Sequence, residues 1–424
     1  MAQYRQRIAD IILDRKLESK GAVLIEGAKW CGKTTTAAQK AGSILYMANA
    51  DELRQNLQIA DMKPSSLLIG KTPRLIDEWQ VAPRLWDAVR FEVDRRGLQG
   101  QFILTGSAVP TETELIQHTG TGRFAWITMR TMSLYESGES SGEVSLEGLF
   151  DSPSEIFATN RLTLDDIAYL ICRGGWPLAT TMGKNAALEQ AYDYYDAIVK
   201  ADVSRADATL KNSERTKRIM RSYARHQGAQ VPIKTIQADL AVNESDALVE
   251  ETVSLYINAL RKIFVIEDVA AWNPNLRSKT AVRTADTRYF SDPSIGVAAL
   301  GLGEKDLLGD LNTMGLFFET LCIRDLRVFA DALNGTVYHY RDKNGLECDA
   351  VIHLRNGSYG LVEIKLGGDN AIEEGAKTLN KLSDKIDTTK MKQPSFKMVL
   401  TAVGSYAFRR NDGVYVVPIG CLKN

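Results

Sequence analysis

Residues 27–35, with the sequence GAKWCGKTT, constrain this chain more than any other stretch. They follow an apolar run at residues 22–25, which predicts a buried strand, and they lead into residues 35–39, which predict the start of a helix. Strand, glycine loop, Lys-Thr and helix together are the full context of a phosphate-binding loop. Glycines let the backbone N–H groups turn toward phosphate oxygens, and the positive end of the following helix adds to the attraction.

The residue types of this loop predict ATP and Mg²⁺ as ligands. Lys33 is expected to reach the β- and γ-phosphates as a point charge, and the Thr34 hydroxyl is expected to ligate Mg²⁺. The nucleotide-binding residues expected here are Gly27, Ala28, Lys29, Trp30, Cys31, Gly32, Lys33, Thr34 and Thr35.

Two further predicted strands end in polar side chains that suit the same site. Residues 74–77 are a short apolar run closed by Asp77 and Glu78. Asp77 is expected to hold Mg²⁺ directly or through water, and Glu78 to act as the general base that polarises the attacking water. Residues 101–107 end in the hydroxyls of Thr105 and Ser107. The carboxyl ends of parallel strands face the ligand crevice, so either hydroxyl is expected to touch the γ-phosphate or orient water, with a plain strand–turn as the alternative.

Arg123 follows two glycines and precedes a predicted strand at residues 124–128. Two interpretations stay open. In one, the chain forms a homo-oligomer and Arg123 acts on a neighbouring subunit's γ-phosphate, an effect of about 10³–10⁵ in rate. In the other, Arg123 is a structural residue that pairs with a carboxylate of its own domain.

Length, net charge, hydropathy and cysteine pattern limit the kinds of protein that this chain can be. A length of 424 residues predicts two to four domains, and a net charge of −1 gives no general support for nucleic-acid binding. No apolar run is long enough to span a bilayer. The cysteines are odd in number, lack a C-x-x-C pair and predict free thiols in a reducing cytoplasm: Cys31, Cys172, Cys322, Cys348 and Cys421.

The middle of the chain has the order of a winged helix. A basic helical segment at 215–226, a second opened by residues 231–234 and a third over 247–262 precede a predicted strand at 263–269. DNA contact through the third helix and the basic segment is one interpretation. Protein contact is the other, because the third helix carries Glu250 and Glu251 and few positive charges.

The carboxyl-terminal third carries a second group of candidate metal-binding and catalytic residues. A helix over 314–333 bears Glu319, and strands are predicted at 336–341, 347–352 and 360–365. Alternation puts Glu363 and Lys365 on one face of a strand, and Asp349 on the neighbouring strand is expected beside Glu363. Clustered carboxylates bind Mg²⁺, and a lysine beside them can activate water for phosphodiester hydrolysis. Glu319 and Glu347 are expected as further ligands, with Tyr338 or Lys377 lining the site.

Several of these motifs resemble those of one known family. The runs GAKWCGKTTTA, LIDEWQ, FILTGSA and GTGRF, the last followed by MSLYE, are similar to a prokaryotic family of AAA-superfamily ATPases with a carboxyl-terminal DUF4143 domain and a restriction-endonuclease-like core. The likeness covers nearly the whole chain, although Thr121 departs from the usual residue before the Gly-Arg pair. It implies Walker A residues Lys33 and Thr34, Walker B residues Asp77 and Glu78, sensor residues Thr105 and Ser107, Arg123 in the Gly-Arg pair, and the Asp349, Glu363, Lys365 arrangement of restriction-like nucleases.

The turn at residues 173–177 matches the family's Gly-Gly-x-Pro signature and is expected to pack a helical lid. The expected fold class is α/β. A P-loop AAA-type parallel-sheet domain takes residues 1–135, a helical lid and connector 136–210, a winged-helix-like domain 211–295 and a mixed α/β PD-(D/E)xK nuclease-like domain 296–424.

The expected function is Mg²⁺-dependent ATP binding and hydrolysis coupled to a nuclease-like module directed at DNA. One alternative is a nucleotide-controlled regulatory or assembly switch in which the nuclease-like fold is a non-cleaving scaffold. A third is a nuclease that a slow ATP site merely gates.

Overall fold

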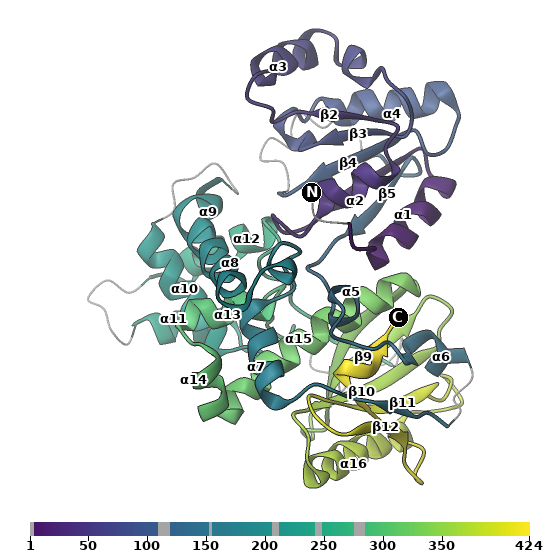
Figure 1. Cartoon of the computed structure of the whole chain (residues 1–424), viewed down its shortest axis with the longest axis vertical. Coiled ribbons are helices and arrows are strands. Elements are labelled where there is room, and N and C mark those ends of the chain that lie inside the picture. Colours follow the sequence, from purple (N-terminus) through teal and green to yellow (C-terminus); the bar gives the residue numbers. More distant parts are fainter. Residues whose placement is uncertain (1–3, 109–118, 152–154, 206–211, 242–247, 275–284) are drawn as a thin grey trace.

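The computed structural model describes residues 4–108, 119–151, 155–205, 212–241, 248–274 and 285–424. Figure 1 shows three masses: an amino-terminal sheet domain, a middle helical domain and a carboxyl-terminal sheet domain. Among the helices of these residues, none has the length and apolar character that crossing a bilayer demands. The five cysteines are buried and free, as expected.

The amino-terminal domain is a parallel five-stranded sheet in the order β2-β3-β4-β1-β5. The central strands β1 and β4 are buried on both faces and read as continuous apolar runs, whereas the edge strands β2 and β5 expose Tyr46 and Trp126. Helices α1 and α2 cover one face, and α4 covers the other. The elements are α1 (Ile8–Ser19), β1 (Ala22–Glu26), α2 (Lys33–Lys40), β2 (Ser43–Tyr46), α3 (Leu53–Met62), β3 (Arg74–Asp77), α4 (Leu85–Arg96), β4 (Phe102–Gly106) and β5 (Phe124–Thr128).

The middle domain is a helical bundle with its own apolar core. The expected order of three helices is present as α10, α11 and α12; the expected start of the third at residue 247 lies outside the described residues. At 263–269 the structure has no named strand, only single antiparallel bridges from Ile266 to Phe290 and from Val269 to Thr287. The helices are α7 (Leu164–Arg173), α8 (Lys184–Ala197), α9 (Val203–Arg205), α10 (Ser213–Arg225), α11 (Ile233–Ala241), α12 (Glu250–Lys262), α13 (Pro293–Leu300) and α14 (Glu304–Gly309).

One expected domain boundary falls inside a helix. The division between residues 295 and 296 would cut α13, whose Ile295 and Ala299 share the core of α8 and α10. The middle domain therefore extends beyond that boundary, because an apolar helix packs with the layer that buries it.

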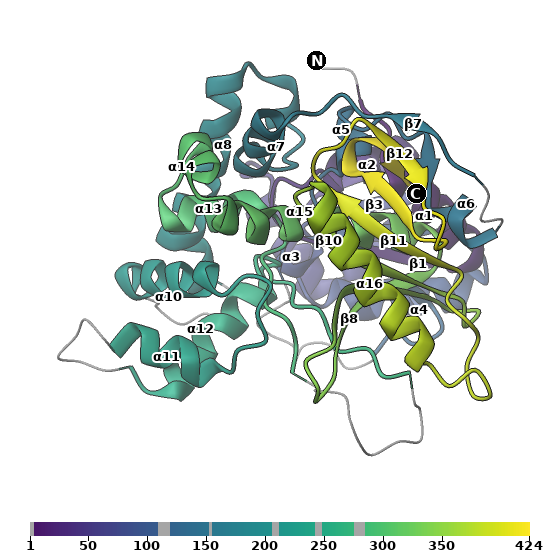
Figure 2. The ribbon, with the colours of Figure 1, turned by 90° about the horizontal axis from the view of Figure 1, so that it is seen from below.

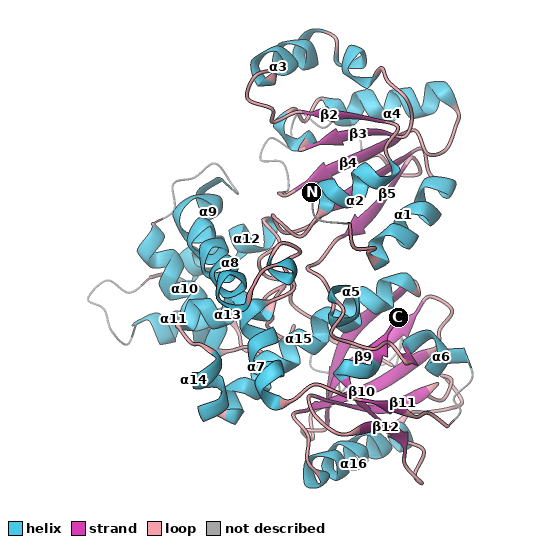
Figure 3. Cartoon of the chain, viewed as in Figure 1, coloured by secondary structure: helices cyan, strands magenta, loops and turns pink. Residues whose placement is uncertain are grey.

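The carboxyl-terminal domain is a mixed seven-stranded sheet in the order β7-β12-β13-β11-β10-β9-β8. Helix α15 covers one face and α16 the other, as Figures 2 and 3 also show. The elements are α15 (Leu311–Ala332), β8 (Gly335–Arg341), β9 (Glu347–Leu354), β10 (Tyr359–Lys365), α16 (Asp369–Lys385), β11 (Phe396–Thr401), β12 (Tyr406–Arg409), β13 (Tyr415–Pro418) and β14 (Leu422–Lys423).

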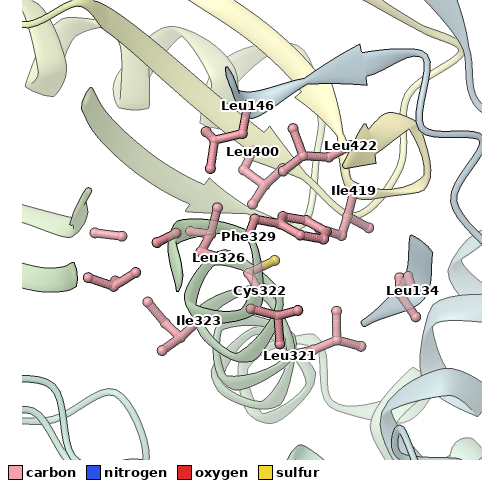
Figure 4. Close-up of a cluster of buried hydrophobic side chains, with 14 of the residues drawn as sticks. Leu134, Leu146, Leu321, Cys322, Ile323, Leu326, Phe329, Leu400, Ile419 and Leu422 are labelled. Carbon is pink, nitrogen blue, oxygen red and sulfur yellow. The ribbon is translucent and has the colours of Figure 1, made fainter. Parts of the chain in front are cut away.

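The segment that follows the amino-terminal domain, from α5 to β7, packs against the carboxyl-terminal domain. It holds α5 (Leu134–Ser137), β6 (Val144–Ser145), α6 (Leu146–Asp151) and β7 (Ala158–Thr159). Strand β6 pairs with β14, and β7 pairs with β12. Leu134 and Leu146 belong to the same buried cluster as Phe329 of α15 and Leu422, and Figure 4 shows Leu146 beside Leu400 and Leu422. The expected connector from residue 136 is thus partly a layer of the carboxyl-terminal domain, because a sheet edge offers hydrogen bonds that a passing chain can satisfy.

Candidate nucleotide site

The loop between β1 and α2 has the backbone that phosphate binding requires. Gly27 and Gly32 have positive φ values of 151° and 102°. A Cβ atom on Gly27 would lie 2.1 Å from the carbonyl oxygen of Met129, so a larger residue does not fit. Trp30 also has a positive φ, of 64°, and is 56% exposed. The loop is therefore fixed by glycine geometry at two points, as the sequence predicts.

The Lys33 ammonium lies inside this loop. Its Nζ donates to the carbonyl oxygens of Gly27 at 3.0 Å and Ala28 at 2.8 Å. The side chain is buried, so the charge is held by the loop's own carbonyls. A phosphate group that entered the loop would find this cation next to the backbone N–H groups.

Three chain segments converge on the carboxylate of Asp77. Its Oδ1 accepts a hydrogen bond from Thr34 Oγ1 at 2.6 Å and another from Thr105 Oγ1 at 2.7 Å. The cause is the parallel register of β3 and β4, which places Asp77 opposite Thr105 at the carboxyl edge of the sheet. The structure thus brings together residues that the sequence assigns separately to the loop, the acidic pair and the third strand.

Glu78 is held in an unusual backbone conformation beside this point. Its φ of 55° and ψ of 47° place a non-glycine residue in the left-handed region, a strain that persists only where the surroundings enforce it. Ser107 Oγ donates to Glu78 Oε2 at 3.0 Å, and Gln80 Nε2 donates to the same oxygen. Gln80 was not predicted; only its place two residues after Glu78 could have suggested it.

A cavity of about 890 Å³ opens over the loop. Besides loop residues, it is lined by Tyr4, Arg5 and Arg7 from the amino end and by Trp176 and Pro177 of the Gly-Gly-x-Pro turn. The sequence gives no local signal for these contacts, because they require distant segments to return to the loop. The turn expected to pack a lid therefore also forms a wall of the cavity.

The predicted loop residues do not all face this cavity. Lys29, Trp30, Gly32, Lys33, Thr34 and Thr35 line it. The Cys31 thiol instead donates to the carbonyl oxygen of Met129 at 3.3 Å, within the core. Arg7, which also lines the cavity, holds the loop in place: one of its guanidinium nitrogens donates to the Cys31 carbonyl at 2.9 Å, and its Nε pairs with Glu136 at 3.0 Å.

Arg123 lies away from the loop of its own chain. It precedes β5, whose first residue is in register with the first residue of β1, so it sits at the amino edge of the sheet. The phosphate loop follows the opposite, carboxyl edge. Arg123 Nε pairs with Asp94 at 2.8 Å on the surface. This arrangement matches the structural interpretation, and any action on a phosphate requires a second subunit.

The predicted carboxyl-terminal residues Asp349, Glu363 and Lys365 do lie together. Lys365 Nζ is 2.8 Å from Glu363 Oε2 and 3.7 Å from Asp349 Oδ2. The backbone N–H of Ile364 donates to Asp349 Oδ2 at 2.7 Å. Burial raises the pKa of Glu363 to about 8, and the Asp349 charge adds to the effect.

The charge of Glu319 acts on Asp349, Glu363 and Lys365, but the hydrogen-bond partner of Glu319 is a residue outside this cluster. The Tyr289 hydroxyl donates to its carboxylate, and a Cβ on Gly228 would lie 3.0 Å from its Oε2. Burial, then the Asp349 charge, raises the pKa of Glu319 to about 8.

The expected metal ligand set Glu319, Asp349 and Glu363 is not assembled in this structure. Within the described ranges, no three His, Cys, Asp or Glu side chains are grouped so as to hold a metal ion. Instead, the Lys365 ammonium is nearest to Glu363 and close to Asp349, while the Tyr289 hydroxyl donates to Glu319. Glu347, another expected ligand, pairs with Arg341 at 2.8 Å.

The basic helix of the middle domain offers few unpaired charges. On α10, Lys217 pairs with Glu214 at 3.1 Å and Arg225 pairs with Asp239 at 3.2 Å. Helix α12 begins with Glu250. DNA contact through this domain stays a prediction that these pairs do not favour.

Comparison with known families covers most of the chain in three parts. Residues 19–138 match the model of an AAA domain, and residues 314–422 match a domain of unknown function, DUF4143. The chain therefore carries an AAA domain near its amino end and a DUF4143 domain near its carboxyl end. This confirms the resemblance drawn from its motifs. The middle of the chain, residues 164–306, matches another domain of unknown function, DUF8612, and this range includes all of α13.

Curated relatives and solved structures are more distant. Uncharacterized proteins of Mycobacterium tuberculosis and Mycobacterium bovis are each 23% identical over 363 residues, which cover 85% of this chain and 74% of the relative. A Walker-type ATPase of Pyrococcus abyssi aligns with a TM-score of 0.42 at 13% identity, over 70% of this chain and 96% of that chain. A DNA replication initiation factor aligns with a TM-score of 0.24 at 14% identity, over 60% of this chain and 92% of that chain. Neither structural alignment is close enough to carry an argument.

Proposed function

We propose that this protein binds and hydrolyses ATP with Mg²⁺ and uses the nucleotide state to control its carboxyl-terminal domain. The observation that carries the proposal is the shared acceptor Asp77 Oδ1, which receives hydrogen bonds from both Thr34 and Thr105. It joins a phosphate loop, an acidic strand end and a third strand at one point, next to the Lys33 ammonium.

The side chains at this point fit a magnesium ion. Thr34 and Asp77 offer a hydroxyl and a carboxylate oxygen, the hard ligands that Mg²⁺ takes in phosphate sites. When bound, Mg²⁺ would neutralise charge on the β- and γ-phosphates. Lys33 would contact the same phosphates, and Thr105 would keep the Asp77 carboxylate oriented.

Glu78 would act as the general base. Its carboxylate is oriented by Ser107 and Gln80 and stands at the carboxyl edge of the sheet, on the side of the cavity. A general base must be held within reach of the water it activates, and the strained backbone of Glu78 fixes that direction.

The wall of the cavity is joined to the carboxyl-terminal domain through a buried carboxylate. Gly175 N donates to Asp292 Oδ2 at 2.9 Å, and Arg324 on α15 pairs with the same oxygen at 3.1 Å. Helix α15 packs beneath β8, β9 and β10 and carries Glu319. A change at the nucleotide would therefore have a continuous packed route to the DUF4143 domain.

Of the functions weighed from the sequence, the geometry favours the switch, with the carboxyl-terminal domain as a non-cleaving scaffold. The reason is that the three expected metal ligands are engaged by Lys365 and Tyr289. Metal-dependent cleavage of DNA is the second candidate, because Lys365 does lie beside Asp349 and Glu363 as that chemistry requires.

Replacing Glu78 with glutamine tests the proposal. We expect E78Q to bind ATP normally and to hydrolyse it about 10²–10⁴ times more slowly, since the amide cannot accept the proton. E18Q on the exposed side of α1 removes one carboxylate elsewhere and should keep the normal rate. Steady-state phosphate release and calorimetric ATP binding supply the two readouts. Normal hydrolysis by E78Q would show that another group is the base.

A further inference from the structure

A second polar cavity lies where the AAA domain meets the carboxyl-terminal sheet. Its volume is about 210 Å³, and it shares no lining residue with the nucleotide cavity. One side comes from α1 and from β5 with the residues just after it; the other comes from the end of α15, β8 and the turn after β9. The lining residues that carry charge are Arg15, Lys16, Arg130, Asp331 and Arg355.

Only one of the four cations in this lining is neutralised by carboxylates. Arg130 donates to both carboxylate oxygens of Glu267, at 2.6 and 2.8 Å, and to Asp331 at 2.6 Å. Asp331, the acidic residue of the lining, is thereby already engaged. The cavity keeps a surplus of positive charge from the three other cations.

None of those three cations forms a direct ion pair with a carboxylate in the described part of the chain. Arg15 donates to the backbone carbonyl of Ala332 at 3.0 Å. Lys16 and Arg355 form no side-chain hydrogen bond or ion pair with any residue that the structure describes. Burial, and then the charges of Arg355 and Arg15, lower the pKa of Lys16, and they outweigh the opposite effect of the Asp331 carboxylate. Like charges gathered in one partly enclosed space repel one another, and a bound anion removes that cost.

We propose that this interdomain cavity binds the terminal phosphate or pyrophosphate group of a nucleotide or of a nucleic-acid strand. The guanidinium forks of Arg15 and Arg355 suit phosphate oxygens, and Lys16 adds a point charge. Asn334 and Thr336 in the lining supply neutral donors. Three unpaired positive charges match a dianionic terminal phosphate better than the single charge of a phosphodiester within a strand.

Such a ligand would bridge two domains. Lys16 belongs to α1 of the AAA domain, whereas Arg355 follows β9 of the DUF4143 domain. An anion held by both would pull these domains together without contacting the phosphate loop. This site is separate from the proposed ATPase function and does not depend on it.

Calorimetry with inorganic pyrophosphate on the full-length K33A protein tests the site, since this background removes binding at the phosphate loop. K16M and R355M should each weaken pyrophosphate binding by about tenfold or more, because each removes a charged donor. K305M, on the exposed surface of α14, is the matched control and should leave the affinity unchanged. Absence of pyrophosphate binding to K33A, or equal affinity in K16M and R355M, overturns the proposal.

Thermal melting in the same K33A background, with K33A as the parent protein, gives a second readout. Without ligand, K16M should melt no lower than the parent protein, because the substitution relieves repulsion. It should also lose the stabilisation that pyrophosphate gives the parent, and a full stabilisation of K16M overturns the proposal. Competition by 5′-phosphorylated but not 5′-hydroxyl single-stranded DNA would identify a strand end as the source. Competition by small nucleotides alone would identify those instead, and either result supports the site.

Discussion

Replacing Asp292 with asparagine is expected to lower the free energy of unfolding by about 4 kcal/mol, the cost of breaking a buried ion pair by removing one partner. Asp292 is fully buried, and its pair Arg324 is 2% exposed. One carboxylate oxygen accepts from Thr131 at 2.6 Å, Gly175 at 2.9 Å and Arg324 at 3.1 Å. The other accepts from Ser294 Oγ at 2.6 Å and from its N–H at 3.0 Å.

The magnitude follows from the number of donors around this carboxylate. An asparagine amide turns one acceptor oxygen into an NH₂ group, which then faces N–H donors on whichever side it takes. The Arg324 guanidinium keeps Asp325, at 2.7 Å, as its remaining charge partner. Since whole domains are stable by only about 5–15 kcal/mol, this loss should be plain in a urea titration followed by circular dichroism.

The same substitution should act on ATP binding. The Gly175–Asp292 hydrogen bond fixes the turn that carries Trp176 and Pro177 into the cavity wall, so D292N should raise the KM for ATP. D310N, at the exposed start of α15, removes a helix-capping carboxylate as the matched control. It should cost far less stability and leave KM unchanged. Equal costs for D292N and D310N would refute the reasoning.

The pH dependence of this effect has a definite sign. Burial opposes ionisation of Asp292, but Arg324 and the hydrogen bonds from Ser294, Thr131 and Gly175 outweigh it and lower its pKa. A lowered folded-state pKa gives stability that is present above the unfolded pKa of about 4 and is lost as the pH falls below it. The difference between wild type and D292N should therefore be the same at pH 8 and at pH 5.

Two further substitutions separate the remaining interpretations. R123A should leave ATP hydrolysis unchanged, because Arg123 pairs with Asp94 at the far edge of the sheet. A large loss that mixing with E78Q subunits restores would instead place Arg123 across a subunit interface. Wild type and D349N should both leave single-stranded, duplex and branched DNA uncut with Mg²⁺ or Mn²⁺, as expected of a scaffold. Cleavage by wild type that disappears in D349N would establish the nuclease instead.

The nucleotide site shows which residues local sequence can predict and which it cannot. The phosphate loop, the acidic pair and Thr105 were all predicted, because each depends on residues that are neighbours in sequence and on strand ends that a parallel sheet must align. Tyr4 and Arg7 were missed because the chain must fold back from the amino end to reach the loop. The same applies to the role of the Gly-Gly-x-Pro turn as a cavity wall.

The carboxyl-terminal cluster shows the opposite case. Strand alternation correctly placed Glu363 beside Lys365, and the neighbouring strand brought Asp349 to them. Whether the three expected carboxylates form a metal site depends on what else reaches them. The Tyr289 hydroxyl that donates to Glu319 comes from the middle domain, and the sequence around Glu319 does not predict this contact.

The sequence by itself therefore determined the chemistry of each local motif, because side-chain type and strand or helix period are short-range properties. Tertiary structure alone decided which motifs meet. It put Asp292 between the cavity wall and α15, sent Arg123 to the far edge of the sheet, and gathered Lys16 and Arg355 from separate domains into one cavity. Such meetings depend on how whole layers pack, and packing joins residues whose separation along the chain carries no signal.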